Sequence, residues 1–292
     1  MAVQIEAFYD SATGTGSYIV INRASNQALI IDPVLHFDLN SGQLSFELAN
    51  QQLAFLQANH LQLKYICDTH AHADHLSAAA YLKNHTDALT VISQGIGEVQ
   101  QRFSARFNKP VVEDLTQLYD VLVADGDILT LGEIEIHVLA TPGHTSDSVS
   151  YYIEDNIFVG DTLFMPDIGT ARCDFPGADA ATLYHSIARI HALPGTTKIW
   201  LCHDYPPPGR EVSLQTTVAQ SREHNIHINH QISKHEFIHR RQAKDRTLGV
   251  PALLYPALQV NLWGALLPAK EDNGRRFIKI PVDCKGADCA GI

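Results

Sequence analysis

Three histidines and an aspartate stand within six consecutive residues: His70, His72, Asp74 and His75. Imidazole and carboxylate groups are costly to bury without partners, so this density exceeds what the start of a helix requires. These side chains are the ligands that zinc, iron and manganese take in proteins. In a loop, His70 and His72 can converge on one ion while Asp74 and His75 turn toward a neighbouring position. The stretch therefore predicts a metal site.

The residues on either side of this cluster predict a strand-to-helix turn. Residues 63–67 are typical of a short buried strand, and residues 76–82 are small and apolar like the start of a packed helix. Ends of strands are where α/β proteins usually present ligands. The same arrangement recurs three more times, because an apolar run precedes each of the later candidate ligands, His144, Asp161 and His203.

The remaining elements follow from the hydrophobic pattern. Residues 17–22 and 27–32 are β-rich runs separated by a polar turn, which indicates a hairpin. Asp32 ends the second run, where it can either accept a hydrogen bond from a ligand histidine or serve as a turn residue. Apolar spacing predicts helices over about residues 45–59 and 180–193.

Composition excludes several classes of protein. The formal net charge of −11 leaves no basic stripe to neutralise phosphates, which argues against a nucleic-acid partner. Five scattered cysteines predict no disulfide framework, and a reducing compartment is the default. The N-terminus lacks the pattern of a signal peptide, and the longest apolar stretch, 250–269, is broken by three prolines. We therefore expect a soluble, cytoplasmic protein with no membrane partner.

The 292 residues can form one domain with an extension, since no repeat or linker divides them. A polar helical stretch over about 214–246 precedes a proline-punctuated segment. Its histidines have no neighbouring carboxylate or thiol partner, so we expect no second metal site there. Cys284 and Cys289 are expected in a mobile tail rather than a site. The predicted partition is a catalytic domain over residues 1–230 and an extension over 231–292 packed on it.

The ordered set of ligands resembles that of the metallo-β-lactamase superfamily over about residues 5–230. The matching motifs are His-x-His-x-Asp-His at 70–75, Thr-Pro-Gly-His-Thr at 141–145, Gly-Asp-Thr-Leu-Phe at 160–164 and a later strand ending in His203. The resemblance implies an α/β (α+β) fold, namely an αββα sandwich with the metal site at one edge between two mixed sheets. It also implies two neighbouring metal positions that share a bridging carboxylate. In the family's pattern, the first position is held by His70, His72 and His144, and the second by Asp74, His75 and His203, with Asp161 as the bridge.

Within the superfamily, three stretches resemble the persulfide dioxygenase branch, in particular its bacterial β-lactamase-like hydrolase relatives. They are residues 68–75, 171–175 and 202–205. In that branch a single iron is held by the residues that match His70, His144 and Asp161. The chain departs from the mitochondrial type, which has Gly-Arg-Thr-Asp-Phe where this chain has Ala-Arg-Cys-Asp-Phe, and it extends beyond the shorter members from about residue 234.

The branch resemblance implies a glutathione-persulfide dioxygenase with one Fe(II) per chain, which uses O₂ and gives sulfite and glutathione. Two imidazoles and a carboxylate on one face of iron leave positions open for O₂ and sulfur. The catalytic set would be His70, His144 and Asp161, together with Asp74. The substrate would be glutathione persulfide or another small thiol-derived compound.

Three residues would bind that substrate. Arg172 would hold a carboxylate of glutathione through its planar fork, unless Asp174 or Asp179 occupies it in an ion pair. Tyr205 would donate a hydrogen bond to the substrate. Cys173 lies beside Arg172, so its pKa could fall and its thiol could accept a persulfide sulfur; otherwise it fills a loop.

Two alternatives stay open at this point. The same seven ligands can hold one or two Zn ions and a bridging hydroxide, which would make the protein a hydrolase of thioesters or lactones. The chain could also be a non-catalytic, persulfide-responsive binding protein that uses Cys173 as its sensor. The sequence does not decide between these metals, and it leaves a homodimer open.

Overall fold

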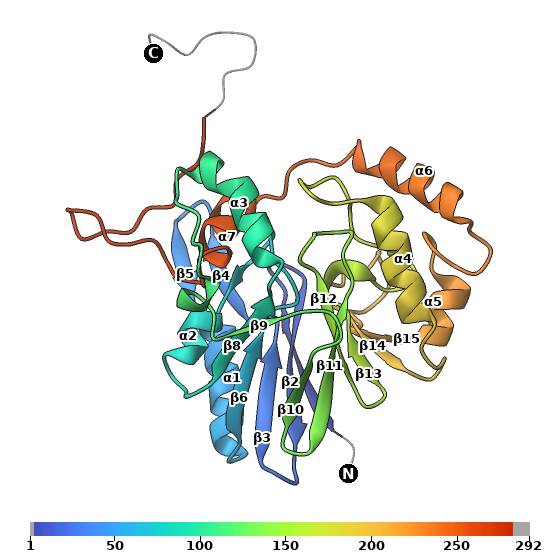
Figure 1. Ribbon diagram of the computed structural model, residues 1–292, viewed down its shortest axis with the longest axis horizontal. Coiled ribbons are helices and arrows are strands. Elements are labelled where there is room, and N and C mark those ends of the chain that lie inside the picture. Colours follow the sequence, from blue (N-terminus) through green and yellow to red (C-terminus); the bar gives the residue numbers. More distant parts are fainter. Residues whose placement is uncertain (1–2, 283–292) are drawn as a thin grey trace.

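Two six-stranded mixed sheets lie face to face, and helices cover the outer face of each (Figure 1). The computed structural model describes residues 3–282, so Cys284 and Cys289 lie outside the described residues. The arrangement is the αββα sandwich that the resemblance implied. The described residues contain no helix that is both long and apolar enough to cross a membrane.

The first sheet has the strand order β1-β2-β3-β6-β8-β9. Its strands are β1 (Gln4–Asp10), β2 (Thr15–Asn22), β3 (Gln27–Ile31), β6 (Gln62–Cys67), β8 (Leu89–Ser93) and β9 (Val121–Val123). The predicted hairpin is confirmed, because β2 and β3 pair antiparallel with Tyr18 opposite Ile31. From β3 onward the strands run parallel, so the carboxyl ends of β3 and β6 meet at one edge.

The second sheet has the order β10-β11-β12-β13-β14-β15, and a small third sheet has the order β5-β4-β7. The strands of the second sheet are β10 (Ile128–Leu131), β11 (Ile134–Ala140), β12 (Val149–Ile153), β13 (Asn156–Phe158), β14 (Lys198–Trp200) and β15 (Gln215–Thr217). Those of the third are β4 (Val34–Asp38), β5 (Gln43–Ser45) and β7 (Leu76–Ser77). The second sheet supplies the strands whose ends lead to His144, Asp161 and His203.

The alternation of side chains along a strand explains how the layers pack. All eight residues of β2 are buried, as expected for a strand covered on both faces. Tyr18 and Val20 face the second sheet and form the central core with its strands. Ile19 and Ile21 point the other way and pack with the helices on the outer face.

The helices divide between the two outer faces. The first sheet is covered by α1 (Glu47–Ala58), α2 (Ala79–Lys83), α3 (Ile96–Phe107) and α7 (Leu254–Asn261). The second is covered by α4 (Ala180–His191), α5 (Val218–His224) and α6 (Lys234–Asp245). Helices α1 and α4 confirm the two predicted from apolar spacing. Helix α7 lies in the proline-punctuated segment, where no helix was predicted.

Two other segments differ from the sequence prediction. The stretch 214–246 is not one helix, because the Asn225 side chain accepts hydrogen bonds from the backbone amides of His227 and Ile228 and ends α5 in a turn. After the histidine cluster, residues 76–77 first form β7, which pairs with β4, and the helix begins only at Ala79. The first difference comes from a local side-chain contact and the second from strand pairing with β4, and each overrides helical spacing.

Candidate metal centre

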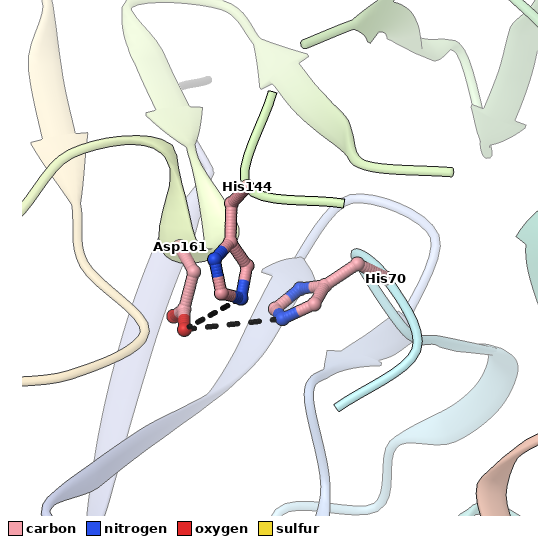
Figure 2. Close-up of side chains that lie close together, drawn as sticks. All are labelled: His70, His144 and Asp161. Atoms are coloured by element: carbon pink, nitrogen blue, oxygen red, sulfur yellow. Dashed lines mark ion pairs between the residues drawn. The ribbon is translucent and has the colours of Figure 1, made fainter. Parts of the chain in front are cut away.

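His70, His144 and Asp161 point toward one another from three separate parts of the chain (Figure 2). The Nε2 atoms of His70 and His144 lie 3.9 Å and 3.6 Å from the same carboxylate oxygen, Oδ2 of Asp161. One ligand atom from each residue lies within 4.8 Å of the others. Donor atoms at this spacing can surround a single cation. From here on, the first position means this group of His70, His144 and Asp161, the set that the branch resemblance implies for a single iron.

A second group of ligands lies beside the first. Nε2 of His203 lies 2.9 Å from Oδ2 of Asp74 and 3.4 Å from Oδ1 of Asp161. Asp161 therefore presents one oxygen to the first position and the other toward His203, as a bridging carboxylate would. Asp74 also lies close to the ligand atoms of His72 and His75. We call Asp74, His75 and His203 the second position.

Buried side-chain atoms that lack a hydrogen-bond partner indicate whether these residues are suited to bind a metal. Buried polar atoms almost always have a hydrogen-bond partner, so each exception requires an explanation. Within the described residues, buried side-chain atoms with no partner include Nε2 of His70 and Oδ1 of Asp161 in the first group, Nε2 of His75 in the second, and Nδ1 of the adjacent His72. Imidazole nitrogen and carboxylate oxygen are both ligands of zinc and iron, so the donor set fits a bound metal.

Asp32 orients two of the histidines from behind. Its Oδ1 accepts from His72 Nε2–H (3.0 Å), and its Oδ2 accepts from the hydroxyl of Thr69 (3.0 Å). The same hydroxyl lies 2.9 Å from Nδ1 of His70 and accepts its proton. These bonds leave His70 Nε2 and His72 Nδ1 free to bind a cation. Of the two roles considered for Asp32, the structure shows the hydrogen bond to a histidine of the cluster.

Two glycines allow the strand ends to approach one another. Gly160, just before Asp161, has φ +52°, and a Cβ there would lie 2.5 Å from Oγ1 of Thr69. Gly143, just before His144, has φ +139°, and a Cβ there would lie 2.4 Å from the backbone nitrogen of Leu183. A side chain at either position would displace the ligand that follows it. The ring of His144 is then fixed by its Nδ1–H, which donates to the carbonyl of Arg172 (2.8 Å).

The two positions differ in electrostatics. Burial lowers the pKa of His70 and His72 well below the ordinary histidine value, so both rings are neutral near pH 7. Burial also acts to lower the pKa of His203, but the carboxylates of Asp74 and Asp161 outweigh it and raise that pKa to about 10. Burial would raise the pKa of Asp74, yet His203 and His75 bring it well below the ordinary value.

Sequence reasoning missed two residues at this centre. The Asp147 carboxylate accepts from the backbone amide of Ala71 (2.8 Å) and so holds the loop between His70 and His72. In the sequence, the only feature that could have pointed to Asp147 is that it follows His144 by three residues. Cys202 is buried, and its sulfur lies within 4.8 Å of ligand atoms of Asp161 and His203.

A pocket of about 350 Å³ opens onto the ligands. Asp74, His144 and Asp161 form part of its wall. Its other lining residues are mostly apolar, with a few basic and polar ones: Ala73, Phe164, Ile168, Thr170, Ala171, Arg172, Phe175, Tyr205, Arg241, Lys244, Leu248 and Pro251. A small organic ligand with a polar group could therefore lie against the metal ligands.

The family model of the metallo-beta-lactamase superfamily matches residues 12–199. The chain belongs to this superfamily. This is a superfamily of enzymes. In this chain, the motifs that match its ordered ligand set lie together at one edge of the sandwich.

Relatives within the superfamily carry different names. The chain is 44% identical to "Glyoxylase B2" of Dictyostelium discoideum, over 96% of this chain and 97% of that protein. It is 42% identical to a "Beta-lactamase hydrolase-like protein" of Xylella fastidiosa, over 96% of this chain and 65% of that protein. It is 30% identical to human "Persulfide dioxygenase ETHE1, mitochondrial", over 70% of this chain and 69% of that protein. The predicted resemblance to the persulfide dioxygenase branch and its bacterial relatives is thus confirmed.

A solved structure agrees with the fold. The crystal structure of ETHE1 from Myxococcus xanthus superposes with a TM-score of 0.73 at 31% identity, over 90% of this chain and all of that one.

Arg172 lines the pocket, and three of its five N–H donors are engaged within the protein. Its Nε and Nη2 donate to the carboxylate of Asp174 at 2.6 and 2.7 Å, and its Nη1 donates to the carbonyl of Gly249 (2.7 Å). The ion pair with Asp174 was the alternative considered from the sequence. Its guanidinium also lies over the ring of Phe175, with 5.0 Å from Cζ to the ring centroid.

Tyr205 and Cys173 lie in different surroundings. The ring of Tyr205 lines the pocket and stacks on His203, with ring centroids 5.5 Å apart and planes 9° apart. Cys173 packs instead against the core beneath α4. Burial and the charge of Asp245 raise the pKa of its thiol, the opposite of the lowering expected from Arg172. Burial is the larger of these two causes, and the guanidinium of Arg172 is paired with Asp174.

Proposed function

We propose that the protein is a dioxygenase of glutathione persulfide that works with one Fe(II) per chain. Glutathione persulfide, O₂ and water would give glutathione, sulfite and two protons. The sulfur–sulfur bond breaks, the outer sulfur is oxidised and O₂ is reduced. Cytoplasmic location stays a prediction from the sequence.

The observation that carries this proposal is the first position and its place in the wall of the pocket. The imidazoles of His70 and His144 and the carboxylate of Asp161 converge there, which is the ligand set of non-haem Fe(II) oxygenases. Bound at this position, Fe(II) would supply sites for sulfur and O₂ side by side and exchange electrons with both, which zinc cannot do. The 30% identity to a persulfide dioxygenase supports the same chemistry.

The protein's own residues would orient the substrate and exclude water. Phe164, Ile168 and Phe175 line the pocket next to the ligands and would surround the persulfide sulfur with apolar groups. The ring of Phe175 lies edge-on to that of His144, with centroids 5.5 Å apart, and so limits its movement. Tyr205 would direct its phenol toward the substrate from the His203 side.

Lys244 in the pocket wall and the neighbouring ring of His227 suit a carboxylate of glutathione. The ring of His227 accepts from the backbone amide of Thr170 through Nδ1 (3.0 Å), so a neutral ring carries its proton on Nε2. Burial and nearby cations lower the pKa of His227 to about 4, which keeps it neutral. Its Nε2 lies 3.4 Å from Nζ of Lys244, so two donors face the same space. A carboxylate placed there would accept from both.

Metal analysis paired with oxygen uptake tests the proposal. Protein purified without added metal is analysed for iron and zinc, and a metal-free sample is reloaded anaerobically with either metal. We expect one Fe per chain, and one O₂ consumed and one sulfite formed for each glutathione persulfide. The zinc-loaded sample should consume no O₂. Oxygen uptake that does not depend on iron would overturn the proposal.

A zinc hydrolase of glutathione thioesters is the second candidate. The unpartnered atoms at both positions favour it, because they could hold two zinc ions. The 44% identity to a protein named Glyoxylase B2 points the same way. Two zinc ions per chain, with cleavage of an acylglutathione and no O₂ uptake, would establish this function in place of the dioxygenase.

A further inference from the structure

The histidine loop between β6 and β7 has no regular secondary structure, so its backbone groups need partners from elsewhere. Side chains supply them. In the first half of the loop, the amides of Thr69 and Ala71 donate to Asp32 and Asp147. The second half, which carries Asp74 and His75, is held by a residue about 185 positions away in the sequence.

That residue is Asn261, at the last position of α7. Its Nδ2 donates to the carbonyls of His72 and His75, both at 2.9 Å. Its Oδ1 accepts from the backbone amide of Ser77 at 2.8 Å. An asparagine side chain has two N–H donors and one carbonyl acceptor, so all three functions are engaged with one loop. The side chain is buried, and Asn261 as a whole is only 5% exposed.

Asn261 is itself held in place. Its carbonyl accepts from the hydroxyl of Tyr119 (2.7 Å), and the carbonyl of Leu262 accepts from Gln100 (2.7 Å). Leu258 and Leu262 pack in the same core cluster as Ala71 of the histidine loop. A rigid helix end therefore contacts the loop through both hydrogen bonds and packing.

We propose that Asn261 is a positioning residue for the metal centre, which fixes the backbone of residues 72–77 so that the imidazoles of His72 and His75 face a cation. The unpartnered atoms of these rings, Nδ1 and Nε2, belong to the two residues whose carbonyls Asn261 holds. The role does not depend on whether the protein is a dioxygenase or a hydrolase. It also gives the C-terminal extension a part in building the site.

Zinc binding to the metal-free protein tests this role without an activity assay. Asn261→Asp keeps the size and the acceptor for Ser77 but loses both donors, and Asn261→Ala removes all three bonds without adding a charge. Loss of a group that orients a ligand typically lowers metal affinity about 10- to 100-fold, and we expect this for both variants in competition with a chromophoric chelator. Gln259→Ala is the matched control.

Gln259 suits the control because it lies on the same helix and is only 3% exposed. Its side chain donates hydrogen bonds to the carbonyls of Tyr255 and Lys279 rather than to the histidine loop. This variant should bind zinc with the affinity of the unaltered protein. Wild-type zinc affinity in a folded Asn261→Asp or Asn261→Ala variant would overturn the proposal.

Hydrogen exchange of backbone amides in the unaltered protein tests the proposal even if neither variant folds. In the unaltered, metal-free protein, the amide of Ser77 should exchange slowly because it donates to Asn261. In the folded variants, exchange should become faster over residues 72–77 and stay unchanged in the first sheet. A Ser77 amide that exchanges as fast as an open loop in the unaltered protein would also overturn the proposal.

Discussion

The two metal positions lie side by side, but their ligand atoms differ in protonation and in hydrogen bonding before a cation binds. At the first, His70 and His144 each use Nδ1 in a hydrogen bond, and both Nε2 atoms face Asp161. Burial keeps His70 neutral. At the second, two carboxylates hold a proton on His203, whose Nε2 lies 2.9 Å from Asp74. A cation at the second position must therefore displace a proton, whereas His70 offers a free lone pair.

This difference separates two functions that share the same ligands. A mononuclear enzyme needs only the first position, and the internal pair of Asp74 and His203 neutralises the second without a metal. A dinuclear hydrolase needs the proton of His203 to leave. The contrast therefore supports the proposed single iron, and it predicts different responses to mutation at the two positions.

The largest expected effect comes from removing one ligand at each position. His144→Ala should lower oxygen uptake on glutathione persulfide by more than about 100-fold, since removal of a ligand itself exceeds the 10- to 100-fold cost of losing an outer-shell group. His75→Ala should leave most of the uptake and the iron content. Iron analysis and oxygen uptake on the two purified variants check this. Equal losses in both would show that the two positions work as one unit.

Asp32 lies behind the first position, and its loss should have a smaller effect. Asp32→Asn keeps the size but cannot accept from Thr69 and His72 in the same way, so the rings lose their fixed orientation. We expect metal affinity about 10- to 100-fold lower, measured by chelator competition. Asp120→Asn is the control, because Asp120 also accepts from a threonine amide and hydroxyl, those of Thr90, outside the metal ligands. A similar loss in both variants would indicate general destabilisation.

The pH dependence of zinc binding should also differ between the positions. The pKa of His203 is about 10, so a cation that binds its Nε2 releases a proton at any lower pH. Affinity at the second position should then rise about tenfold per pH unit from pH 6.5 to 8.5. First-position affinity should change much less, since His70 is already neutral. Calorimetric titration in buffers of different ionisation enthalpy counts the protons released. The His203→Asn variant should lose the steep pH dependence of zinc affinity.

The candidate ligands could be picked out from the sequence because they are encoded locally, and the structure brings their side chains close together. Each follows an apolar strand, and the strands of a sandwich bring their ends to one edge. The histidine cluster and its order with His144, Asp161 and His203 were sufficient to predict the family and the fold. The orienting role of Asp32 could be only one of two alternatives, because it depends on a contact across 40 residues with His72.

The C-terminal contribution could not be predicted in the same way. Pro251 and Pro256 suggested an interrupted segment, yet Pro256 lies in the first turn of α7, where backbone amides have no acceptor within the helix. The role of Asn261 rests on contacts between residues about 185 positions apart. No periodicity or spacing in the sequence contains that information.

The smallest expected effect concerns the substrate rather than the metal positions. Lys244 carries a charge that faces the Nε2–H of His227, so Lys244→Ala should raise KM for glutathione persulfide several-fold and leave kcat nearly unchanged. Lys234→Ala, on the same helix but beside His185 instead of the pocket, should leave both constants unaltered. A small persulfide without a carboxylate should show the same KM with Lys244→Ala as with the unaltered protein. If it loses affinity as glutathione persulfide does, Lys244 acts on the metal positions and the separation of substrate and metal sites is wrong.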